Sequence, residues 1–516
     1  MTDEKAAPNA QAHRSLNRHM FHGSVWMLLL RLGIRLTGFL STVILARLLI
    51  PADFGIVAMA MFVVGLLEML NQSGQVLAII RHPNPTRADY DTAWTLSVIV
   101  AFIIALLIWI TAPIAVIYFH EPRVKAVLEC LSLRSLLAGF ENIGTADFRR
   151  DLKFNLFFLY NISGKLFSFV VAIPLALIWR NYWALVVGII AAQLARNVMS
   201  FVMHSYRPRL SLARLSEMGP FSTWTLLRAV GNYLSFQIDQ IAVGGMMGSG
   251  AMGRYAVATD VASSPSYEIN TPMVAVLYPV MSKARSDALA LRRLYLNTFG
   301  WSAVICLSTS VGVTMVAHDL VFLVLGRKWL DIEPLMGWLA LGTGILGLTS
   351  GAYTTFDAIG KPYLGAKMQW TRLILLTVAL VPICIILRNM TAVAIGRLAM
   401  IAIFIPTLLF ATGREISVSP RDYLEALWRP VAASCAMVVV LRLSNGWLSP
   451  GNLRLFCDVI FGAVTFGGVL IFAWALSGKP QGPEKDIHSA MLGALNRVRQ
   501  GGLKMLGRPA DSSSNF

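Results

Sequence analysis

The chain has 516 residues, of which 56% are hydrophobic and only 14% are charged, and its formal net charge is +17. A soluble protein of this length carries about a quarter charged residues, so the composition excludes a soluble globular enzyme or binding module. The sequence instead predicts an all-α polytopic membrane protein.

The first twenty residues are polar and basic, and the apolar run after them is too long for the core of a signal peptide. No small-residue cleavage site follows this run. Residues 1–20 are therefore predicted to form a cytoplasmic N-terminal arm that leads into a retained first span.

Windows of about 20 apolar residues predict fourteen membrane spans. The fourth and the eighth are weak, because the fourth contains Arg134 and the eighth contains Asp260 and Glu268. The predicted spans are 24–46, 52–80, 93–118, 124–147, 154–178, 183–205, 218–247, 251–281, 294–318, 332–357, 363–387, 391–411, 423–443 and 453–476.

Lysine and arginine are distributed unevenly between the loops. With the N-terminus inside, 26 of these residues fall in cytoplasmic segments and ten in the opposite loops. This bias follows the positive-inside rule and predicts that both termini are cytoplasmic. The net charge is thus explained by membrane topology, and no nucleic-acid partner is expected.

The tail, residues 479–516, is basic and contains 486-DIHSAMLGALNRVRQGGLKML-506. This pattern is typical of an amphipathic helix on the cytoplasmic membrane surface. An ordinary disordered tail would have a similar composition, so both interpretations stay open.

Two spans carry matching polar stripes. In each stripe four residues follow 4-3-4 spacing, which places them on one helical face. The stripe of span one is Arg31, Arg35, Gly38 and Thr42, and that of span seven is Arg228, Asn232, Ser235 and Asp239, offset by 197 residues. The following segments, 48-LLIPADFGIVAMA-60 and 246-MMGSGAMGRYAVAT-259, also correspond, and they align Gly55 with Gly253.

This repeat predicts two pseudo-symmetric six-helix lobes, residues 21–213 and 214–412, around a central cleft. Two further helices in residues 413–478 follow them. Such lobes are typical of transporters that open alternately to the two sides of the membrane.

Several arginines lie at membrane depth, where an ionisable side chain is costly and usually functional. A water-filled cavity that binds an anion would explain the set. An interhelical ion pair, for example Arg35 with Glu68, is the alternative for any single member. The predicted substrate-binding residues are Arg31, Arg35, Arg134, Arg228, Asn232 and Arg372.

Carboxylates at membrane depth often carry protons or Na⁺, and Asp239, Asp260 and Glu268 are the predicted ion-coupling residues. Asp239 is the first choice, because it shares a helical face with Arg228. The alternative is that these carboxylates form ion pairs with Arg228 or Arg254.

Other motifs predict no catalysis. A G-x-G-x-x-G sequence at Gly342 lies inside an apolar span, where small residues let helices approach closely. Asp89 and Asp91 precede the third span, and Asp91 with Thr92 is placed to cap it. The five cysteines and eight histidines form no ligand cluster, so no metal or cofactor is predicted.

Five stretches resemble the polysaccharide-transport branch of the MOP flippase superfamily, in particular Wzx-type exporters of the colanic acid and succinoglycan kind. The resemblance runs from about residue 20 to residue 480, and its most specific element is the first loop. The stretches are 45-LARLLIPADFGIVAMA-60, 89-DYDTAWTLS-97, 147-DFRRDLKFN-155, 277-LYPVMSKARSD-287 and 357-DAIGKPYLGAKMQ-369.

The resemblance implies a MATE-like fold and a flippase for undecaprenyl-pyrophosphate-linked oligosaccharide repeat units in the inner membrane of a Gram-negative bacterium. It also implies coupling to an ion gradient, with cavity arginines that meet the substrate pyrophosphate, above all Arg31, Arg35 and Arg228. A polysaccharide polymerase and a chain-length regulator are expected companions, and one chain is expected to suffice for function.

Two alternatives remain. A small-molecule antiporter of the same superfamily would share this architecture, although a net cationic cleft would repel organic cations. A polysaccharide polymerase or ligase would need a large catalytic outward loop, and every outward loop predicted here is short.

Overall fold

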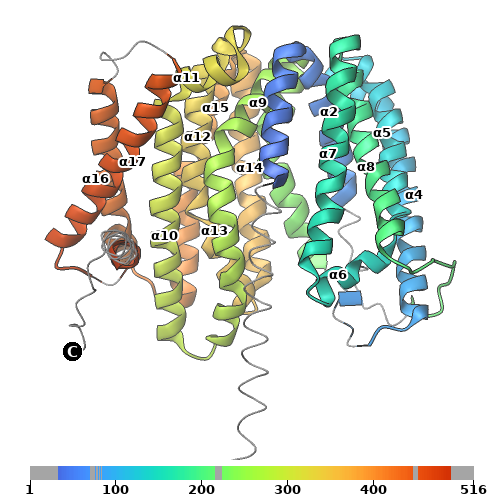
Figure 1. Ribbon diagram of the computed structural model, residues 1–516. Coiled ribbons are helices and arrows are strands. Elements are labelled where there is room, and N and C mark those ends of the chain that lie inside the picture. The colour runs from blue at the N-terminus through green and yellow to red at the C-terminus, as the bar shows by residue number, and fades with distance from the viewer. Residues whose placement is uncertain are drawn as a thin grey trace, which may run out of the picture. The chain divides into compact units, whose positions relative to one another are not determined.

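The computed structural model describes residues 33–69, 76, 79–80, 82, 84–215, 223–444, 451–480 and 482–489. Within these ranges the chain is helical and has no β-strand, as predicted (Figure 1). The helix at residues 33–48 is followed by α2 (Pro51–Glu68), α4 (Arg87–Phe119), α5 (Arg123–Gly139), η2 (Ile143–Ala146), α6 (Asp147–Arg150), α7 (Phe154–Trp179), α8 (Trp183–Met203), α9 (Thr223–Lys283), α10 (Ala288–Met315), α11 (Ala317–Leu320), η4 (Val321–Leu325), η5 (Arg327–Ile332), α12 (Glu333–Gly347), α13 (Ser350–Ala358), α14 (Pro362–Leu387), α15 (Met390–Ile416), α16 (Pro420–Ser444) and α17 (Asn452–Leu476).

Every predicted span overlaps a helix of the structure, and the chain is a multi-pass membrane protein. Ten helices in the described part of the chain are long and apolar enough to cross a membrane. α5 has 17 residues and falls short of that length. The total of fourteen spans therefore stays a prediction.

α9 consists of two helices joined at Gly248. The backbone of this residue has φ 84° and ψ −178°, which interrupts the helical hydrogen bonding. A positive φ of this kind favours glycine, because a Cβ atom would be strained there. The break separates the predicted seventh and eighth spans.

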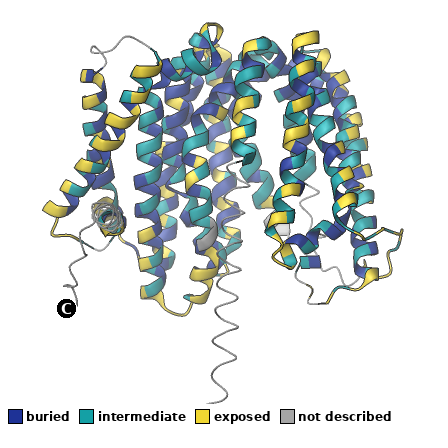
Figure 2. Cartoon of the chain, in the orientation of Figure 1, coloured by how far each residue is buried: buried dark blue, intermediate teal, exposed yellow. Residues whose placement is uncertain are grey.

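Apolar side chains are exposed along α7 and α17 and along α4 from Ile99 to Tyr118 (Figure 2). Ile117 on α4 and Ile178 on α7 are each 74% exposed. A soluble protein would bury such surfaces, whereas lipid covers them without cost.

The start of α4 is capped by Thr86 and Asp89. Asp89 Oδ2 accepts hydrogen bonds from the Thr86 backbone N–H (2.7 Å) and from Thr86 Oγ1 (2.8 Å). The predicted cap at Asp91 and Thr92 is therefore wrong, since these residues lie within the helix and the N-cap is Thr86.

The G-x-G-x-x-G sequence on α12 serves helix packing. A Cβ atom on Gly344 would lie 2.3 Å from Ser310 Oγ, and one on Gly347 would lie 2.5 Å from Cys306 Sγ. The Cβ atom on Gly344 would also lie 2.8 Å from the Cys306 carbonyl oxygen, so α10 and α12 would have to move apart, whereas Gly342 has no atom within 4 Å of its Cβ position.

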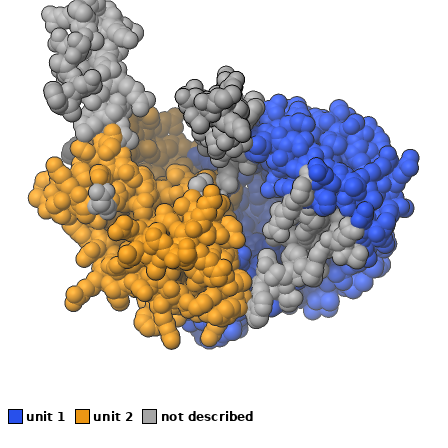
Figure 3. Space-filling view, turned by 90° about the horizontal axis from the view of Figure 1, so that it is seen from below, with its two compact units in different colours: residues 1–257, 324–332, 369–393 blue, residues 258–323, 333–368, 394–516 orange. Residues whose placement is uncertain are grey.

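The chain divides into two compact units (Figure 3). Unit 1 comprises residues 1–257, 324–332 and 369–393, and unit 2 comprises residues 258–323, 333–368 and 394–516. These units divide the chain differently from the predicted lobes, whose boundaries stay a prediction.

Candidate functional site

The polar stripe on the first half of α9 faces α14 within unit 1. Ser235 and Asp239 are 3% and 1% exposed, while Arg228 and Asn232 are half-buried. Gln369 Nε2 on α14 donates to Asn232 Oδ1 (3.0 Å). Ser235 Oγ donates to the carbonyls of Gly231 (2.6 Å) and Gln369 (3.2 Å). The stripe is therefore held against α14 by polar contacts.

Arg372 lies one turn after Gln369 and belongs to the same seam. It is 2% exposed, and its guanidinium carbon lies 5.2 Å from the centre of the Phe236 ring. This is within the range of a cation–π interaction. Trp370 Nε1 donates to the Leu227 carbonyl (3.2 Å) on the neighbouring turn of α9. The predicted residues Asn232 and Arg372 thus lie along the same seam between α9 and α14.

The three predicted ion-coupling carboxylates lie in different environments. Asp239 is buried, and its Oδ2 accepts a hydrogen bond from Tyr255 OH (2.8 Å). Asp260 is exposed and Glu268 is half-buried. Arg254, one of their suggested partners, instead pairs with Asp331 (Nε–Oδ2 2.5 Å). The ion-pair alternative for the three carboxylates stays a prediction.

Arg134 forms an ion pair between α5 and α2. Its Nη1 donates to Glu68 Oε1 at 2.5 Å, and Ser135 Oγ donates to the same oxygen at 2.9 Å. Glu68 thus has Arg134 as its partner, where the sequence suggested Arg35 as an example. Arg35 is half-buried, and Arg31 lies outside the described residues.

A second carboxylate, Glu141, has a comparable environment at the end of α5. Tyr160 OH donates to its Oε2 (2.5 Å) and Gln193 Nε2 to its Oε1 (2.6 Å). Arg196 Nε lies 3.4 Å from Glu141 Oε1. Glu68 and Glu141 therefore each balance one arginine of the N-terminal helices.

The segments that the sequence aligned as repeats touch each other in unit 1. A Cβ atom on Gly55 would lie 1.8 Å from the carbonyl oxygen of Ser249, and one on Gly253 would lie 1.8 Å from that of Pro51. The offset of 198 residues relates Pro51 to Ser249 and Gly55 to Gly253. The contact is thus reciprocal, as expected for two copies of one motif around a local two-fold axis.

The first loop is fixed by polar contacts at the same end of unit 1. Asp53 accepts hydrogen bonds from the backbone N–H groups of Ile50 and Tyr182, each at 3.2 Å. Trp329 Nε1 donates to the Ala46 carbonyl (2.9 Å) while the indole packs edge-on against Phe54. The Arg-Leu-Leu-x-Pro-x-Asp-Phe-Gly run therefore has a structural role at its Asp, Phe and Gly positions.

A cavity of about 480 Å³ opens beside this contact. Glu121 lies in its wall and accepts two hydrogen bonds from Arg123 (Nε and Nη2, 2.8 Å each) and one from Ser249 Oγ (3.1 Å). Arg123 holds the pKa of Glu121 below its ordinary value against desolvation, and Ser249 adds to this effect. The cavity is lined by Phe119, His120, Glu121, Gly245, Met246, Gly248, Ser249, Ile385 and Arg388.

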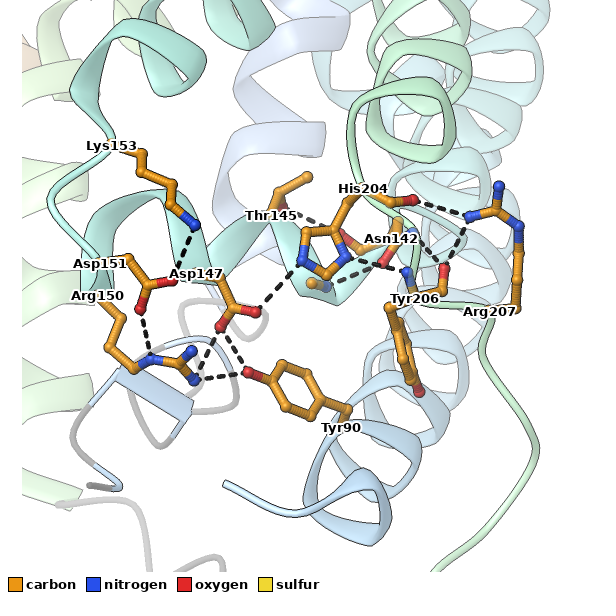
Figure 4. Close-up of polar contacts among 11 residues, drawn as sticks. Tyr90, Asn142, Thr145, Asp147, Arg150, Asp151, Lys153, His204, Tyr206 and Arg207 are labelled. Atoms are coloured by element: carbon orange, nitrogen blue, oxygen red, sulfur yellow. Dashed lines mark hydrogen bonds and ion pairs between the residues drawn. The ribbon is translucent and has the colours of Figure 1, made fainter. Parts of the chain in front are cut away.

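A polar cluster joins α4, α6 and the segment after α8 (Figure 4). Asp147 is its centre, and we call it the Asp147 cluster. Tyr90 OH donates to Asp147 Oδ1 (2.5 Å), and Arg150 Nη1 lies 2.9 Å from the same oxygen. His204 Nε2 lies 3.3 Å from Asp147 Oδ2, and the Tyr206 backbone N–H donates to His204 Nδ1 (3.2 Å). Nε2 is therefore the ring nitrogen of His204 that faces Asp147.

The segment after α8 continues along α4. Tyr206 OH donates to Asp91 Oδ1 (2.5 Å), and the Arg209 backbone N–H donates to the same oxygen (3.0 Å). Burial and the Asp91 carboxylate raise the pKa of Tyr206, so its hydroxyl stays protonated. Asp91 thus holds this segment against α4. The 89-DYDTAWTLS-97 and 147-DFRRDLKFN-155 stretches are joined by the hydrogen bond between Tyr90 and Asp147.

The partners in these clusters were not predicted from the sequence. Gln369 and Tyr255 are uncharged and show no periodicity of their own, although Gln369 ends one of the stretches that carry the resemblance. His204 and Tyr206 follow a span directly, and only the fold brings them to Asp147 and Asp91.

The family described as "Polysaccharide biosynthesis protein" matches residues 44–334. The lipopolysaccharide biosynthesis protein WzxC of Escherichia coli strain K12 is 22% identical over 435 residues, which cover 83% of this chain and 87% of WzxC. The succinoglycan biosynthesis transport protein ExoT of Rhizobium meliloti strain 1021 is 24% identical over 351 residues, covering 68% of this chain and 70% of ExoT.

Two solved structures share the fold. The lipid II flippase MurJ in an inward closed conformation has a TM-score of 0.67 at 12% identity and covers 88% of this chain and 99% of MurJ. An inward-facing multidrug resistance MATE family transporter of the MOP superfamily has a TM-score of 0.60 at 14% identity, covering 76% of this chain and 98% of the transporter. The predicted MOP and MATE-like fold is confirmed.

Proposed function

The chain belongs to the polysaccharide biosynthesis protein family, and from this premise we propose that it is a flippase for undecaprenyl-pyrophosphate-linked oligosaccharide repeat units. The proposal rests on the agreement between the sequence relatives and the solved structures that share the fold. Curated relatives are named for lipopolysaccharide and succinoglycan biosynthesis, and the fold matches 99% of a lipid II flippase. The protein would thereby serve the biosynthesis of an exopolysaccharide, a capsule or an O-antigen.

The substrate is an anion, and the proposal assigns its recognition to arginines on membrane helices. Arg35, Arg228 and Arg372 would contribute positive charge, together with Arg31. A guanidinium fork suits phosphate oxygens, because it donates two parallel hydrogen bonds. Asn232 would orient the sugar or phosphate beside Arg228. Arg134 already forms an ion pair with Glu68. It would therefore position these two helices and would not bind the substrate phosphate directly.

The transport cycle would alternate access between the lobes 21–213 and 214–412, with the helices of residues 413–478 at their side. An ion gradient would drive it through a carboxylate. Asp239 is the best candidate because it is buried and hydrogen-bonded to Tyr255. Asp260 and Glu268 are the second choices.

The protein would reside in the inner membrane with both termini cytoplasmic, where repeat units are assembled on the lipid carrier. A polymerase and a chain-length regulator would act on its product. One chain would suffice for transport, because both lobes belong to it.

A second function, small-molecule antiport, is favoured by the fold similarity to a multidrug transporter. The cationic residues proposed for substrate binding argue against organic cations but would suit anionic metabolites. An enzymatic role as a polymerase or ligase is not supported by these comparisons, because ExoT is named a transport protein and MurJ a flippase.

The test is deletion in the native host, with analysis of lipid-linked sugars in the membrane and of polymer outside the cell. Loss of polymer with repeat units trapped on the cytoplasmic leaflet is expected. Normal polymer with altered resistance or metabolite export would overturn the proposal in favour of the antiporter.

A further inference from the structure

The segment after α8 turns back along the first turns of α4 (Figure 1). Its course is fixed by three hydrogen bonds: Arg87 Nη2 to the Arg207 carbonyl (3.4 Å), the Arg209 N–H to Asp91 Oδ1 (3.0 Å) and the Ser211 N–H to Thr95 Oγ1 (3.0 Å). Each step of two residues along the segment thus corresponds to about one turn of α4. The Arg214 N–H then donates to Thr92 Oγ1 (3.3 Å), so the chain reverses after Ser211. We call residues 206–215 the return segment.

Apolar side chains are exposed where the return segment reverses. Leu210 is 76% exposed and Leu212 is 46% exposed. They flank Ser211, whose partner Thr95 lies about one helical turn before Ile99. Ile99 is the first exposed apolar side chain of α4, and it marks where the lipid-facing surface of this helix begins. The two leucines therefore lie at the boundary of the membrane.

The exposed charges of the return segment and of the start of α4 are positive. Arg87, Arg207 and Arg209 are exposed, whereas Asp89 and Asp91 are 8% and 6% exposed. Arg207 Nη1 donates to two backbone carbonyls (2.8 and 3.0 Å), which orient its guanidinium. The Arg209 side chain forms no hydrogen bond or ion pair with the residues that the structure describes.

The order of these groups along α4 matches the layers of a bilayer. Arg207 is bonded at the level of Arg87 and Arg209 at the level of Asp91, whereas the leucines lie next to the lipid-facing surface. In a bilayer, phosphates lie outside the acyl chains in the same order. Positive charge beside exposed leucines is the pattern that binds anionic lipid surfaces.

We propose that the return segment binds the headgroups of anionic phospholipids. Leu210 and Leu212 insert among the upper parts of the acyl chains, and the guanidinium groups of Arg87, Arg207 and Arg209 contact the phosphates. Arginine suits this position, because its stem lies along apolar surface while its fork donates two parallel hydrogen bonds to a phosphate. A soluble protein partner fits less well, because the leucines adjoin the lipid-facing surface of α4. The proposal does not depend on the transported substrate.

The first test counts lipids bound to the purified full-length protein by native mass spectrometry, with phosphatidylglycerol and phosphatidylcholine as probes. Wild type should retain phosphatidylglycerol in preference. The double variant Arg207→Gln/Arg209→Gln should bind phosphatidylglycerol on the order of tenfold more weakly, with unchanged binding of phosphatidylcholine.

The matched control is Arg293→Gln/Arg421→Gln, which removes the same charge from exposed positions in unit 2 and should bind as wild type does. Unchanged binding in the first double variant, or an equal loss in both, would overturn the proposal. Arg209→Gln alone serves if the double variant does not fold, because the described residues make no polar contact with that side chain.

The second test locates the leucines in wild-type protein. The full chain is placed in vesicles of phosphatidylglycerol and phosphatidylcholine that contain a lipid with a photoreactive group near the top of its acyl chain. After illumination, peptide mapping should find label both near Ile99 and on the return segment. Label near Ile99 with none on residues 206–215 would place the segment in water, which would overturn the proposal in favour of a soluble partner.

Discussion

At the scale of single residues, the arginines of unit 1 differ in what surrounds their charge. Arg134 lies beside the carboxylate of Glu68, whereas Arg372 lies over the ring of Phe236. A guanidinium that is already matched by a carboxylate has little attraction left for a phosphate. Arg134 is therefore a weak candidate for anion binding.

The pair between Arg134 and Glu68 should behave as a structural element. Both side chains are largely withdrawn from solvent, at 19% and 27% exposed. Arg134→Ala should lower the free energy of unfolding by about 1–3 kcal/mol, because Glu68 is left without its partner. The double variant with Glu68→Ala should recover part of the loss in thermal unfolding. Lys125→Ala is the control, since its pair with Glu129 is exposed and should change little.

Arg228 should behave differently if it meets the substrate. Arg228→Ala should abolish or strongly reduce transport while the protein accumulates in the membrane at a near-normal level. Arg228→Lys should rescue poorly, because an ammonium group cannot make the bidentate contact. Complementation of the deletion strain and immunoblotting measure the two quantities. Failure of the variant to accumulate would instead make Arg228 a structural residue, and Arg421→Ala, at an exposed position, is the surface control.

At the scale of helices, the two repeated segments pack closely against each other at one end of unit 1. Gly55→Ala should prevent this packing, because its Cβ atom would lie 1.8 Å from the Ser249 carbonyl oxygen, a backbone atom. Overpacking of this kind costs about 1–3 kcal/mol or more. Gly38→Ala is the matched control, since no atom lies within 4 Å of its Cβ position. Equal thermal stability of the two variants would show that the contact can relax.

The turn between α4 and α5 should respond to acid through Glu121. Its folded pKa is lowered, so it contributes stability above the unfolded value of about 4.3, and this contribution disappears as pH falls through the folded value. Glu121→Gln should therefore be less stable than wild type at pH 7, and the two should converge in acid. Thermal unfolding across this pH range measures the difference, and a constant difference down to the lowest pH would disprove the assignment.

The positions of the elements were more predictable from sequence than the contacts between them. Apolar runs predicted the long helices, because such runs depend only on local composition. The offset between Gly55 and Gly253 also identified two segments that are in contact. The pairing of Glu68 with Arg134 rather than Arg35 depends on helix rotation, which a single span does not specify. The cap at Thr86 was missed because several oxygen-bearing residues precede α4 and only geometry selects among them.

At the scale of the whole molecule, an apolar exterior encloses ionisable groups that a membrane protein retains only for a purpose. The exposed faces of α4, α7 and α17 suit lipid, while Asp239, Asp319, Arg372 and Asp458 are buried. A transported ion or an anionic substrate would act on such buried groups.

Asp239 is the carboxylate by which this idea can be tested for the transport cycle. Asp239→Asn keeps the shape of the side chain and a partner for Tyr255 OH, but it removes the charge that a proton or Na⁺ would neutralise. Transport by this variant, measured as polymer export at several pH values and Na⁺ concentrations, should become independent of the coupling ion and slower than wild type. Asp260→Asn, at an exposed position, should retain the wild-type dependence. If the ion dependence is unchanged in Asp239→Asn and lost in Asp260→Asn, the coupling carboxylate is Asp260, and the buried hydrogen bond between Asp239 and Tyr255 only joins the two halves of α9.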